Sequence, residues 1–497
     1  MSSFWRDRID VQAPSTAVTD TRYDYVVVGG GITGLATALL LSRAGSSVAV
    51  LEARHLGFGA TGNTTAKLSV LQGTRLSSIS GKHTNEAVRH YVHANLDAQR
   101  WLLDLMQDKG VPFQLRDAYT YAQTDKGIEA VETEFRAARR AGLPVQRVDR
   151  LDTAFPALSA VVLKDQAQFD PMDVVALLAG EARSHGTDIF EGIRVRSVRT
   201  DRGDQVLATE QGDVRAGTVI LATGIPILDR GGYFARVHPE RSYAAAFDVS
   251  EEIPTGMYLS ADQPSRSVRT VPTADGEVLL TGGAGHTVGR TRSEQALVDE
   301  LIEWTTRSFP TARLRARWSA QDYVSIDELP YVGPLVPGND NIMVATGYAK
   351  WGMSNGIAAA LMLSGIFHGN RQPWASALNA SRYQQLSGIP SAAMINGAVG
   401  VQMVKGWAGA AVAGSPGPQD PAAEGAGEIR REGTHPVGVC TVGGRRHRVS
   451  AICPHLYGIL KWNDAEASWD CPLHGSRFRH DGEIIEGPAT SPLRRLD

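Results

Sequence analysis

The stretch that decides the fold is Asp24-Tyr25-Val26-Val27-Val28-Gly29-Gly30-Gly31-Ile32-Thr33-Gly34, near the start of a 497-residue chain. Its first five residues have the apolar, β-branched character of a buried strand. The run 35–44 predicts a helix that Gly45 ends, and 47–51 predicts a second strand. This order of strand, glycine-rich turn, helix and strand, with glycines spaced G-x-G-x-x-G, predicts a Rossmann-like unit that binds a dinucleotide.

Each glycine of this turn has a separate physical purpose. Gly29 allows the tight turn, Gly31 lets the backbone approach a pyrophosphate, and Gly34 lets the helix pack on the strand. The first turn of the helix then offers free amides and a positive dipole end to the phosphates. Glu52 ends the second strand, 18 residues after Gly34, where its carboxylate is expected to bind the adenosine ribose hydroxyls.

Four further stretches carry a family resemblance. Small and hydroxylated residues fill 57–68, and Val219-Ile220-Leu221-Ala222-Thr223-Gly224 is a strand that runs into a turn. Gln168-Phe169-Asp170-Pro171 precedes a helix over 174–184, which leads to a strand ending near Val195. The segments 327–333, 343–347 and 352–356 open a late helix over 357–366. Together these stretches resemble the D-amino-acid oxidase-like FAD-dependent oxidoreductases, which include glycine and sarcosine oxidases.

The resemblance implies an α/β fold, in which a Rossmann-like FAD-binding domain interleaves with an antiparallel-sheet substrate domain of α+β type. The FAD-binding parts are expected at 23–84, 150–235 and 325–385, and the substrate-side parts at 85–149 and 236–324. Residues 85–142 are expected to be helical. Residues 1–22 are expected to be a tail. Residues 386–427 are expected to bridge to the last domain, with a helix at 397–407 and a flexible, Ala-, Gly- and Pro-rich linker after it.

The resemblance also implies which residues bind the cofactor, FAD. They are Gly29, Gly31, Ile32, Thr33, Gly34, Glu52, Ala53, Ala60, Thr61, Thr65, Val195, Ala222, Thr223, Gly224, Gly347, Gly352, Met353 and Ser354. Some relatives attach FAD through a Cys or a His, but the matching neighbourhoods here read Gln321-Asp322-Tyr323 and Asn63-Thr64. We therefore expect FAD to be held without a covalent bond.

The catalytic candidates are two lysines, Lys67 and Lys350, which flank flavin-binding stretches. A cation near the reactive edge of the flavin can stabilise its reduced form, assist oxygen, or hold a substrate carboxylate. Other side chains are candidates to face the substrate, although each could equally be a surface or packing residue: Arg241, Tyr243, Tyr258, Arg269 and Trp351. Gly283-x-Gly285 lacks a third glycine in register, so we expect a turn there and no separate NAD(P)H domain.

A second chemistry lies near the C-terminus, where Cys453-x-His455 and Cys471-x-x-His474 are separated by fifteen residues. Two thiolates and two imidazoles fit either a structural zinc ion or a Rieske [2Fe-2S] cluster. Each loop carries one Cys and one His, whereas zinc fingers usually pair like with like. The flanking residues 474–478 and 487–489 resemble the Rieske family, which implies a small all-β domain over 428–497 with these four residues as iron ligands.

Two features of this motif bear on the cluster's potential. The disulfide cysteines of respiratory Rieske proteins are missing from both loops, and Phe478 stands where high-potential relatives carry a hydrogen-bonding Tyr. Fewer donors to the cluster destabilise its reduced state. We therefore predict a potential in the lower part of the Rieske range.

Composition limits the partners and the location. A net charge of −3 gives no reason to expect nucleic acid or an anionic membrane as partner. The longest apolar runs are too short to span a bilayer, and the polar N-terminus lacks a signal-peptide core. Of three cysteines, two belong to the cluster motif and Cys440 reads as a buried apolar residue, so no disulfide framework is expected. The expectation is a cytoplasmic protein.

The sequence thus predicts an enzyme with two cofactors, which oxidises a small amine or amino-acid-like substrate and passes electrons to an external acceptor protein or to O₂. Two alternatives stay open. The chain could be an electron-transfer component that feeds a separate oxygenase, or an oxidase that uses O₂ with the Rieske domain as a sensor. A Rieske oxygenase is disfavoured because the remaining histidines show no two-His-one-carboxylate spacing.

Overall fold

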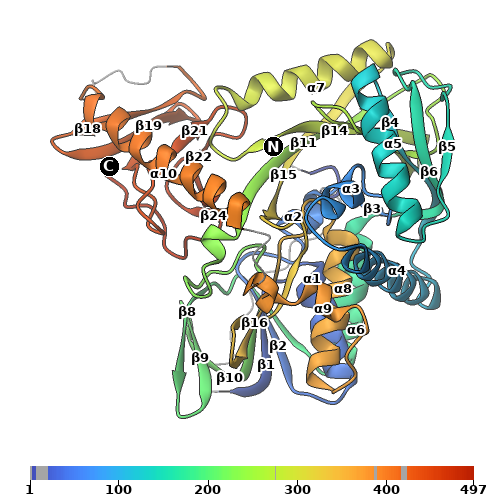
Figure 1. Ribbon diagram of the computed structural model, residues 1–497. Helices are drawn as coiled ribbons and strands as arrows, with labels where there is room; N and C mark the ends of the chain where they lie inside the picture. The colour runs from blue at the N-terminus through green and yellow to red at the C-terminus, as the bar shows by residue number, and fades with distance from the viewer. Residues whose placement is uncertain (1–2, 7–20, 275, 385–388, 416–422, 497) are drawn as a thin grey trace.

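The computed structural model describes residues 3–6, 21–274, 276–384, 389–415 and 423–496. Figure 1 shows two large sheets that lie one above the other, with a small β-rich domain at one side. The chain crosses between the two large sheets several times before it enters the small domain. Segments far apart in sequence therefore meet between the sheets.

The first sheet contains the strand that precedes the glycine-rich turn and has the order β16-β17-β10-β1-β2-β7. Strand β9 also pairs with β10, and β8 pairs with β9. Strand β1 pairs in parallel with both β2 and β10, so three strands end at the same edge. The bounds are β1 Arg22–Val28, β2 Val48–Glu52, β7 Asp188–Glu191, β8 Val195–Asp201, β9 Asp204–Thr209, β10 Gly212–Leu221, β16 Tyr331–Val336 and β17 Asn339–Thr346.

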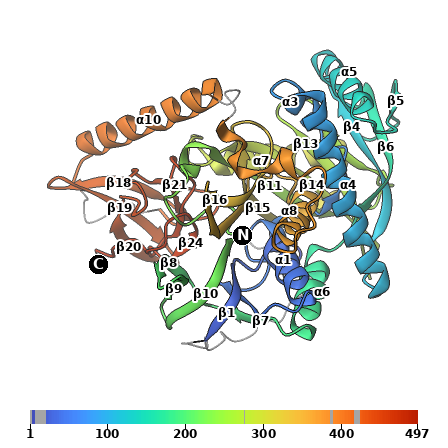
Figure 2. The same ribbon diagram turned by 60° about the horizontal axis from the view of Figure 1, so that its bottom comes forward.

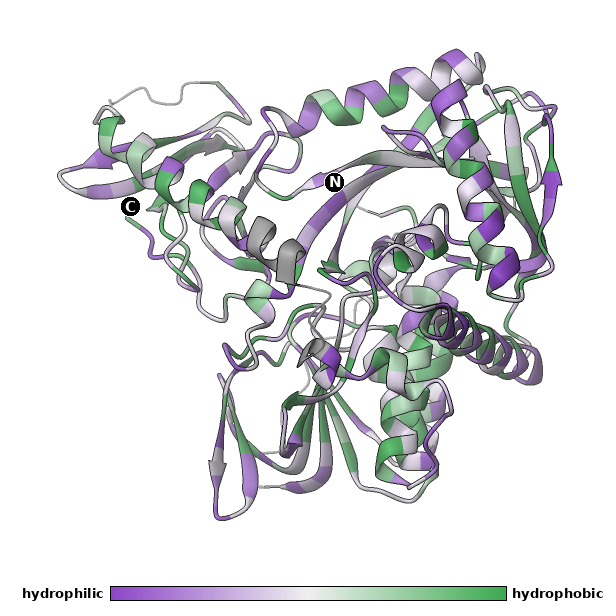
Figure 3. Ribbon diagram, in the orientation of Figure 1, coloured by the Kyte–Doolittle hydropathy of each residue, from purple (hydrophilic) through white to green (hydrophobic). Residues whose placement is uncertain are grey.

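Three helices pack together beside this sheet, namely α1 (Ile32–Arg43), α6 (Pro171–Ser184) and α8 (Gly352–Phe367). Helix α8 is apolar on nearly all sides, as buried helices are, and Figure 3 shows hydrophobic residues along most of it. Leu35 and Leu39 of α1 and Ile357 and Leu363 of α8 are fully buried in one core. This packing fixes the N-termini of α1 and α8 side by side.

The second sheet is larger and has the order β15-β11-β14-β13-β12-β4-β6-β3, with β5 on β6. Its pairs are antiparallel except for β12 with β4. The strands are β3 Lys67–Leu68, β4 Gln114–Ala122, β5 Gln146–Val148, β6 Ser159–Gln168, β11 Val237–Asp248, β12 Met257–Ser260, β13 Arg266–Thr273, β14 Gly276–Thr287 and β15 Arg313–Ser325. The helices of this part are α2 Ala60–Asn63, α3 Arg75–Ser80, α4 Asn85–Asp108, α5 Asp125–Arg140 and α7 Glu294–Ser308.

The C-terminal domain consists of two small antiparallel sheets, β18-β19-β20 and β21-β22-β23-β24. A long helix, α10 (Ile389–Val412), lies along the outside of this domain in Figure 2. The strands are β18 Gly427–Glu432, β19 His435–Val442, β20 Arg445–Ser450, β21 Lys461–Asn463, β22 Ser468–Asp470, β23 Arg477–Arg479 and β24 Ile484–Glu486. Short elements α9 (Ala375–Leu378), η2 (Tyr233–Ala235) and η3 (Ala380–Gln384) complete the described chain.

The predicted fold class is confirmed, but several local predictions are wrong. The start of the chain is not all tail, because Trp5 is fully buried and its indole N–H donates to the Thr64 carbonyl at 2.7 Å. Residues 85–142 are not all helical, since β4 separates α4 from α5. Strand β6 belongs to the second sheet, although 150–235 is assigned to the FAD-binding part by the resemblance. The two misplaced strands, β4 and β6, share a cause, because strand pairing depends on partners that are distant in the sequence.

The bridging helix and the strand expected to end near Val195 also differ from their predicted bounds. Helix α10 extends beyond 397–407 at both ends, and part of the predicted linker, 416–422, lies outside the described residues. Val195 begins β8, whereas the preceding strand β7 ends at Glu191. No helix in the described ranges is long and apolar enough to cross a membrane.

Candidate functional site

A cavity of about 980 Å³ lies where the two large sheets and the C-terminal domain meet. Residues of all three parts line it, including the glycine-rich turn, Lys67 of β3, and Glu486 of β24. Sites of this kind, between domains and at the carboxyl ends of parallel strands, are where cofactors bind in α/β proteins. The cavity is therefore the candidate active site.

The glycine-rich turn forms one wall of this cavity with the close contacts that only glycine permits. Gly29 has φ +110°, and a Cβ atom on it would lie 2.5 Å from the Ala222 carbonyl oxygen. A Cβ atom on Gly34 would lie 2.0 Å from the Gly29 carbonyl oxygen. Both observations agree with a turn built for close backbone approach. The turn leads directly into α1, whose N-cap is Gly31.

Glu52 lies at the end of β2 beside this turn and lines the cavity. Its carboxylate accepts hydrogen bonds from the amides of Gly30, at 2.7 Å, and Arg54, at 2.8 Å. Burial raises the pKa of Glu52, and these two amide donors oppose that effect. Because each carboxylate oxygen can accept more than one hydrogen bond, Glu52 still fits a ribose hydroxyl.

The structure brings most of the predicted FAD-binding residues to this one cavity. Those in its wall are Gly29, Gly31, Ile32, Thr33, Glu52, Ala53, Ala60, Thr61, Thr65, Val195, Ala222, Thr223, Gly224, Gly352 and Met353. Three of the predicted residues do not line the cavity, namely Gly34, Gly347 and Ser354. Gly34 supports the turn, Gly347 has φ +82° before the late helix, and the Ser354 hydroxyl accepts a hydrogen bond from Gln72 at 3.1 Å.

Helix α8 contributes a second N-terminus to the cavity, next to that of α1. A Cβ atom on Gly356 would lie 2.6 Å from the Thr33 hydroxyl, so the glycine is needed for this close packing. Gly352 and Met353 of its first turn line the cavity. Two positive helix ends thus face the same space, which suits a cofactor with phosphates and a ring that gains negative charge on reduction.

Lys67 points into this cavity and is held by neutral groups. Its ammonium donates to the hydroxyls of Thr65, at 3.0 Å, and Ser267, at 2.5 Å. Burial, together with repulsion from Arg269, lowers the pKa of Lys67 to about 7. An ammonium group in this environment is poised to take up an anionic partner.

Lys350 also lines the cavity but has an anionic partner already. Its ammonium lies 3.0 Å from Glu240 Oε2. A hydrogen bond from His238, opposed by burial and supported by Lys350, lowers the pKa of Glu240 to about 2, so the pair stays ionised. The two lysines, which the sequence does not distinguish, thus differ in their partners: Lys67 is bonded to neutral hydroxyls, whereas Lys350 is paired with a carboxylate.

The other candidates for substrate contact fall into two groups. Tyr243 and Trp351 line the cavity, whereas Tyr258 and Arg269 do not. Arg269 is buried and donates to the Ala66 carbonyl at 2.6 Å. Arg241 is the clearest departure, because it is fully buried and forms an ion pair with Glu466 of the C-terminal domain.

The four predicted metal ligands lie in two loops of the C-terminal domain, which contact Asp229, Phe234 and Gln321 of the preceding part of the chain. They lie as two like pairs. The thiols of Cys453 and Cys471 share a hydrogen bond, and the rings of His455 and His474 lie 5.2 Å apart at 88°. In the described part of the chain, no three His, Cys, Asp or Glu side chains surround a single point. Paired thiolates and paired imidazoles fit the two irons of a Rieske cluster, one pair on each iron.

The environment of the histidines agrees with this arrangement. His474 Nδ1 is buried and has no hydrogen-bond partner among the described residues. Burial, with repulsion from His455, lowers the pKa of His474 to about 4, so its imidazole is neutral, as a metal ligand must be. His455 Nε2 lies 2.6 Å from Asp229, and the Phe234 ring meets the His474 ring edge-on at 5.9 Å. The imidazole end of the site is thus covered by the FAD-binding part of the chain.

The hydroxyl of Ser476 lies at the cysteine end of the site. It interacts with Cys453 and accepts the Ala489 amide at 3.0 Å. Phe478, fully buried, supplies no second donor. We predict that Ser476→Ala lowers the reduction potential of the cluster, because a thiolate hydrogen bond stabilises the more negative reduced state.

A hydrogen bond to a charged group contributes about 1.5–3 kcal/mol, so a shift of tens of millivolts is expected when part of this is lost on reduction. Redox titration followed by electron paramagnetic resonance (EPR) measures it. The matched control is Ser184→Ala, exposed at the end of α6, which should leave the potential unchanged. A Ser476→Ala potential equal to that of the unaltered protein would contradict the prediction.

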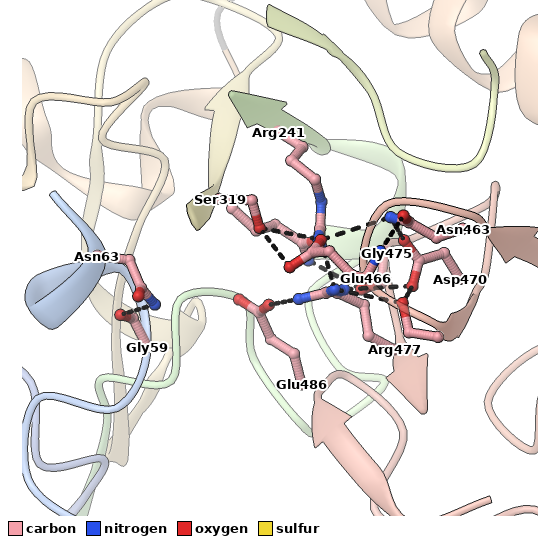
Figure 4. Close-up of polar contacts among 12 residues, drawn as sticks. Gly59, Asn63, Arg241, Ser319, Asn463, Glu466, Asp470, Gly475, Arg477 and Glu486 are labelled. Atoms are coloured by element: carbon pink, nitrogen blue, oxygen red, sulfur yellow. Dashed lines mark hydrogen bonds and ion pairs between the residues drawn. The ribbon is translucent and has the colours of Figure 1, made fainter. Parts of the chain in front are cut away.

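A polar junction joins the cavity to the C-terminal domain, as Figure 4 shows. It consists of Arg241, Ser319, Gln321, Glu466, Gly475 and Arg477. Ser319 donates to Glu466 at 2.8 Å, Arg477 lies 2.8 Å from Glu466, and Gln321 donates to the Gly475 carbonyl at 2.8 Å. The sequence does not point to this junction, although polar residues at 319, 321 and 323 do alternate along one face of a strand.

Comparison with known proteins agrees with the predictions for both parts of the chain. Residues 24–365 match the DAO family of FAD dependent oxidoreductases, and residues 422–497 match the Rieske [2Fe-2S] domain. The chain is 29% identical to the putative Rieske 2Fe-2S iron-sulfur protein YhfW of Bacillus subtilis, over 100% of this chain and 97% of that protein.

Two glycine oxidases match the larger, FAD-dependent part of the chain. That of Bacillus licheniformis is 23% identical over 73% of this chain and 98% of its own. The crystal structure of glycine oxidase from Geobacillus kaustophilus superposes with a TM-score of 0.58 at 20% identity, over 71% of this chain and 96% of that one. The chain therefore belongs to the DAO family of FAD-dependent oxidoreductases and carries a Rieske [2Fe-2S] domain at its C-terminal end.

Proposed function

We propose that this protein oxidises a C–N bond of a small amine or amino acid in the cavity, and that the electrons leave one at a time through the Rieske cluster to an external carrier. The observation that supports this most strongly is the junction. Gln321 is part of the cavity wall and also bonds to Gly475, the residue after His474. One side chain thus touches both cofactor sites.

We assign the cofactors to the residues that the sequence singles out. FAD would be held without a covalent bond by the turn at Gly29–Gly34, by Glu52, and by the two helix N-termini. Cys453 and Cys471 would hold one iron of the cluster, and His455 and His474 the other. When bound, FAD supplies the two-electron oxidation and can release its electrons singly.

The cavity favours a substrate that carries a carboxylate. Lys67 offers an ammonium whose hydrogen-bond partners, Thr65 and Ser267, are neutral. Glycine, the substrate named for the two matched glycine oxidases, has a carboxylate and an amine. We therefore assign Lys67 to the substrate carboxylate, and Lys350, paired with Glu240, to the structure of the cavity wall.

The substrate would lose two electrons and two protons when its amine becomes an imine, and the protons would be released to solvent. The two electrons would reach the cluster one at a time, and an external one-electron carrier would remove each before the next arrives. The partner is thus a redox carrier, and the imidazole end of the cluster receives electrons from within the chain. We also propose a cytoplasmic location, because two of the three cysteines belong to the cluster motif and leave no disulfide framework.

The substrate class can be tested with the purified holoprotein under anaerobic conditions. We expect amino acids or N-methylated amino acids to bleach the flavin absorbance, and the corresponding 2-hydroxy acids to leave it unchanged, because they lack the C–N bond. Bleaching by NADH instead of by any amine would contradict the proposal. It would favour a component that carries electrons for another enzyme.

A further inference from the structure

We propose that Gln321 is a positioning residue for electron transfer, whose amide fixes the second Rieske ligand loop against the cavity wall and provides the bonded route between the two sites. This inference rests on the proposed function, because it assumes that electrons move from the cavity to the cluster. It adds the residue through which the two sites are joined.

The position of Gln321 follows from the pairing of two strands. In β15, Ser319, Gln321 and Tyr323 lie on one face because successive side chains alternate, and all three are buried. On β11, Arg241 is the cross-strand partner of Gln321. The strands thus bring a fully buried guanidinium beside the amide.

The hydrogen bonds of Gln321 leave its side chain a single orientation. Its Oε1 accepts from Arg241 at 2.7 Å, and its Nε2 donates to the Gly475 carbonyl at 2.8 Å and to the Tyr323 hydroxyl at 3.0 Å. Because Arg241 can only donate, it also fixes which end of the amide faces Gly475. Three hydrogen bonds and burial thus fix the position of the Gln321 side-chain amide.

The partner loop is shaped for this contact. Gly475 has φ +78°, and a Cβ atom there would lie 2.6 Å from Pro239 and 2.8 Å from Gln321 Nε2. The Gly475 amide also donates to the Cys471 carbonyl at 3.1 Å. A single hydrogen bond therefore leads from the cavity wall to Gly475, which follows His474 directly and whose amide is bonded to the Cys471 carbonyl.

Two Gln321 variants separate the hydrogen bond to Gly475 from other effects of the side chain. Gln321→Leu removes every hydrogen bond at a similar size. Gln321→Glu keeps the acceptor for Arg241 but removes the donor to Gly475. The matched control is Arg196→Ala, which removes a different hydrogen bond between the domains, to the Thr490 carbonyl at 2.5 Å, and leaves the residues of the junction intact.

Anaerobic stopped-flow measurements on the three holoproteins follow flavin and cluster absorbance together. In both Gln321 variants, cluster reduction should become at least tenfold slower relative to the flavin reduction measured in the same variant, a factor that corresponds to about 1.4 kcal/mol in the barrier. Arg196→Ala should match the unaltered protein in both. Dithionite-reduced samples of all three should give the same cluster EPR spectrum, which shows that the cluster is intact.

Amide hydrogen exchange of residues 471–477 gives a readout that does not depend on electron flow. It should rise in both Gln321 variants and stay unchanged in Arg196→Ala. Cluster reduction at the unaltered rate in either Gln321 variant would overturn this inference alone. No cluster reduction in the unaltered protein would overturn the proposed function as well.

Discussion

Replacing Glu466 with Gln should destabilise the protein by about 3–5 kcal/mol at neutral pH, the usual cost of removing one partner of a buried ion pair. Glu466 lies between two buried guanidinium groups, Arg241 and Arg477. Arg477 keeps Asp470 as an ionic partner, at 3.2 Å, but Arg241 would keep only neutral ones, Ser319 and Gln321. The uncompensated charge of Arg241 should therefore dominate the loss.

This prediction has a defined pH window. Burial alone would raise the pKa of Glu466, but Arg477 and Arg241 outweigh it and lower the pKa to about 2. The carboxylate therefore stabilises the folded protein fully above the pKa of an unfolded Glu, about 4.3, and the contribution is lost as pH falls toward 2. The difference between the unaltered protein and Glu466→Gln should shrink across this window.

Urea unfolding, followed by the cluster absorbance, measures the difference. The matched control is Asp213→Asn, which removes the exposed ion pair with Arg199 at 2.9 Å and should cost no more than about 1 kcal/mol. Adding Arg241→Met to Glu466→Gln should restore part of the stability, since it removes the unpaired charge. Equal losses for Glu466→Gln and Asp213→Asn would show that the junction is not a buried ion pair.

Replacing Lys67 with Met should weaken the binding of carboxylate substrates by about ten- to a hundredfold, because a hydrogen bond to a charged group contributes about 1.5–3 kcal/mol. The reason is that Lys67 is the cavity lysine held by neutral groups, Thr65 and Ser267. Lys350, by contrast, is paired with Glu240.

The affinity should also depend on pH. With a pKa of about 7, Lys67 carries its proton below that pH and loses it above. Affinity for an anionic substrate should therefore fall as pH rises through 7 in the unaltered protein, and stay flat in Lys67→Met. Titration of the flavin spectrum with a substrate-like carboxylic acid measures both effects.

Lys164→Met, on the exposed part of β6, is the matched control and should bind as the unaltered protein does. If Lys67→Met kept the affinity and the pH profile of the unaltered protein, the assignment of Lys67 to the carboxylate would be wrong.

The local parts of this structure could be predicted from sequence because short-range patterns determine them. The glycine spacing at 29–34 and the periodicity of 35–44 suffice for β1 and α1, and two Cys–His loops suffice for the four metal ligands. Each of these features depends on residues close in the chain.

What could not be predicted depends on pairing between distant strands. Arg241 and Gln321 are 80 residues apart and meet only because β11 pairs with β15 in one register. Without that register, an Arg among strand residues is as plausible a substrate ligand as an ion-pair partner for another domain. The same reason explains why the sequence does not place β6, within 150–235, in the second sheet, and why it does not distinguish Lys67 from Lys350.

Electron transfer within one chain, from the cavity to the Rieske cluster, can be followed by rapid anaerobic mixing of the oxidised holoprotein with a substrate that bleaches the flavin, then freezing and EPR at successive times. We expect the signal of the reduced cluster to appear as the flavin is reduced, at a rate independent of protein concentration. A fully reduced flavin beside a cluster that stays oxidised would show that electrons do not take this route.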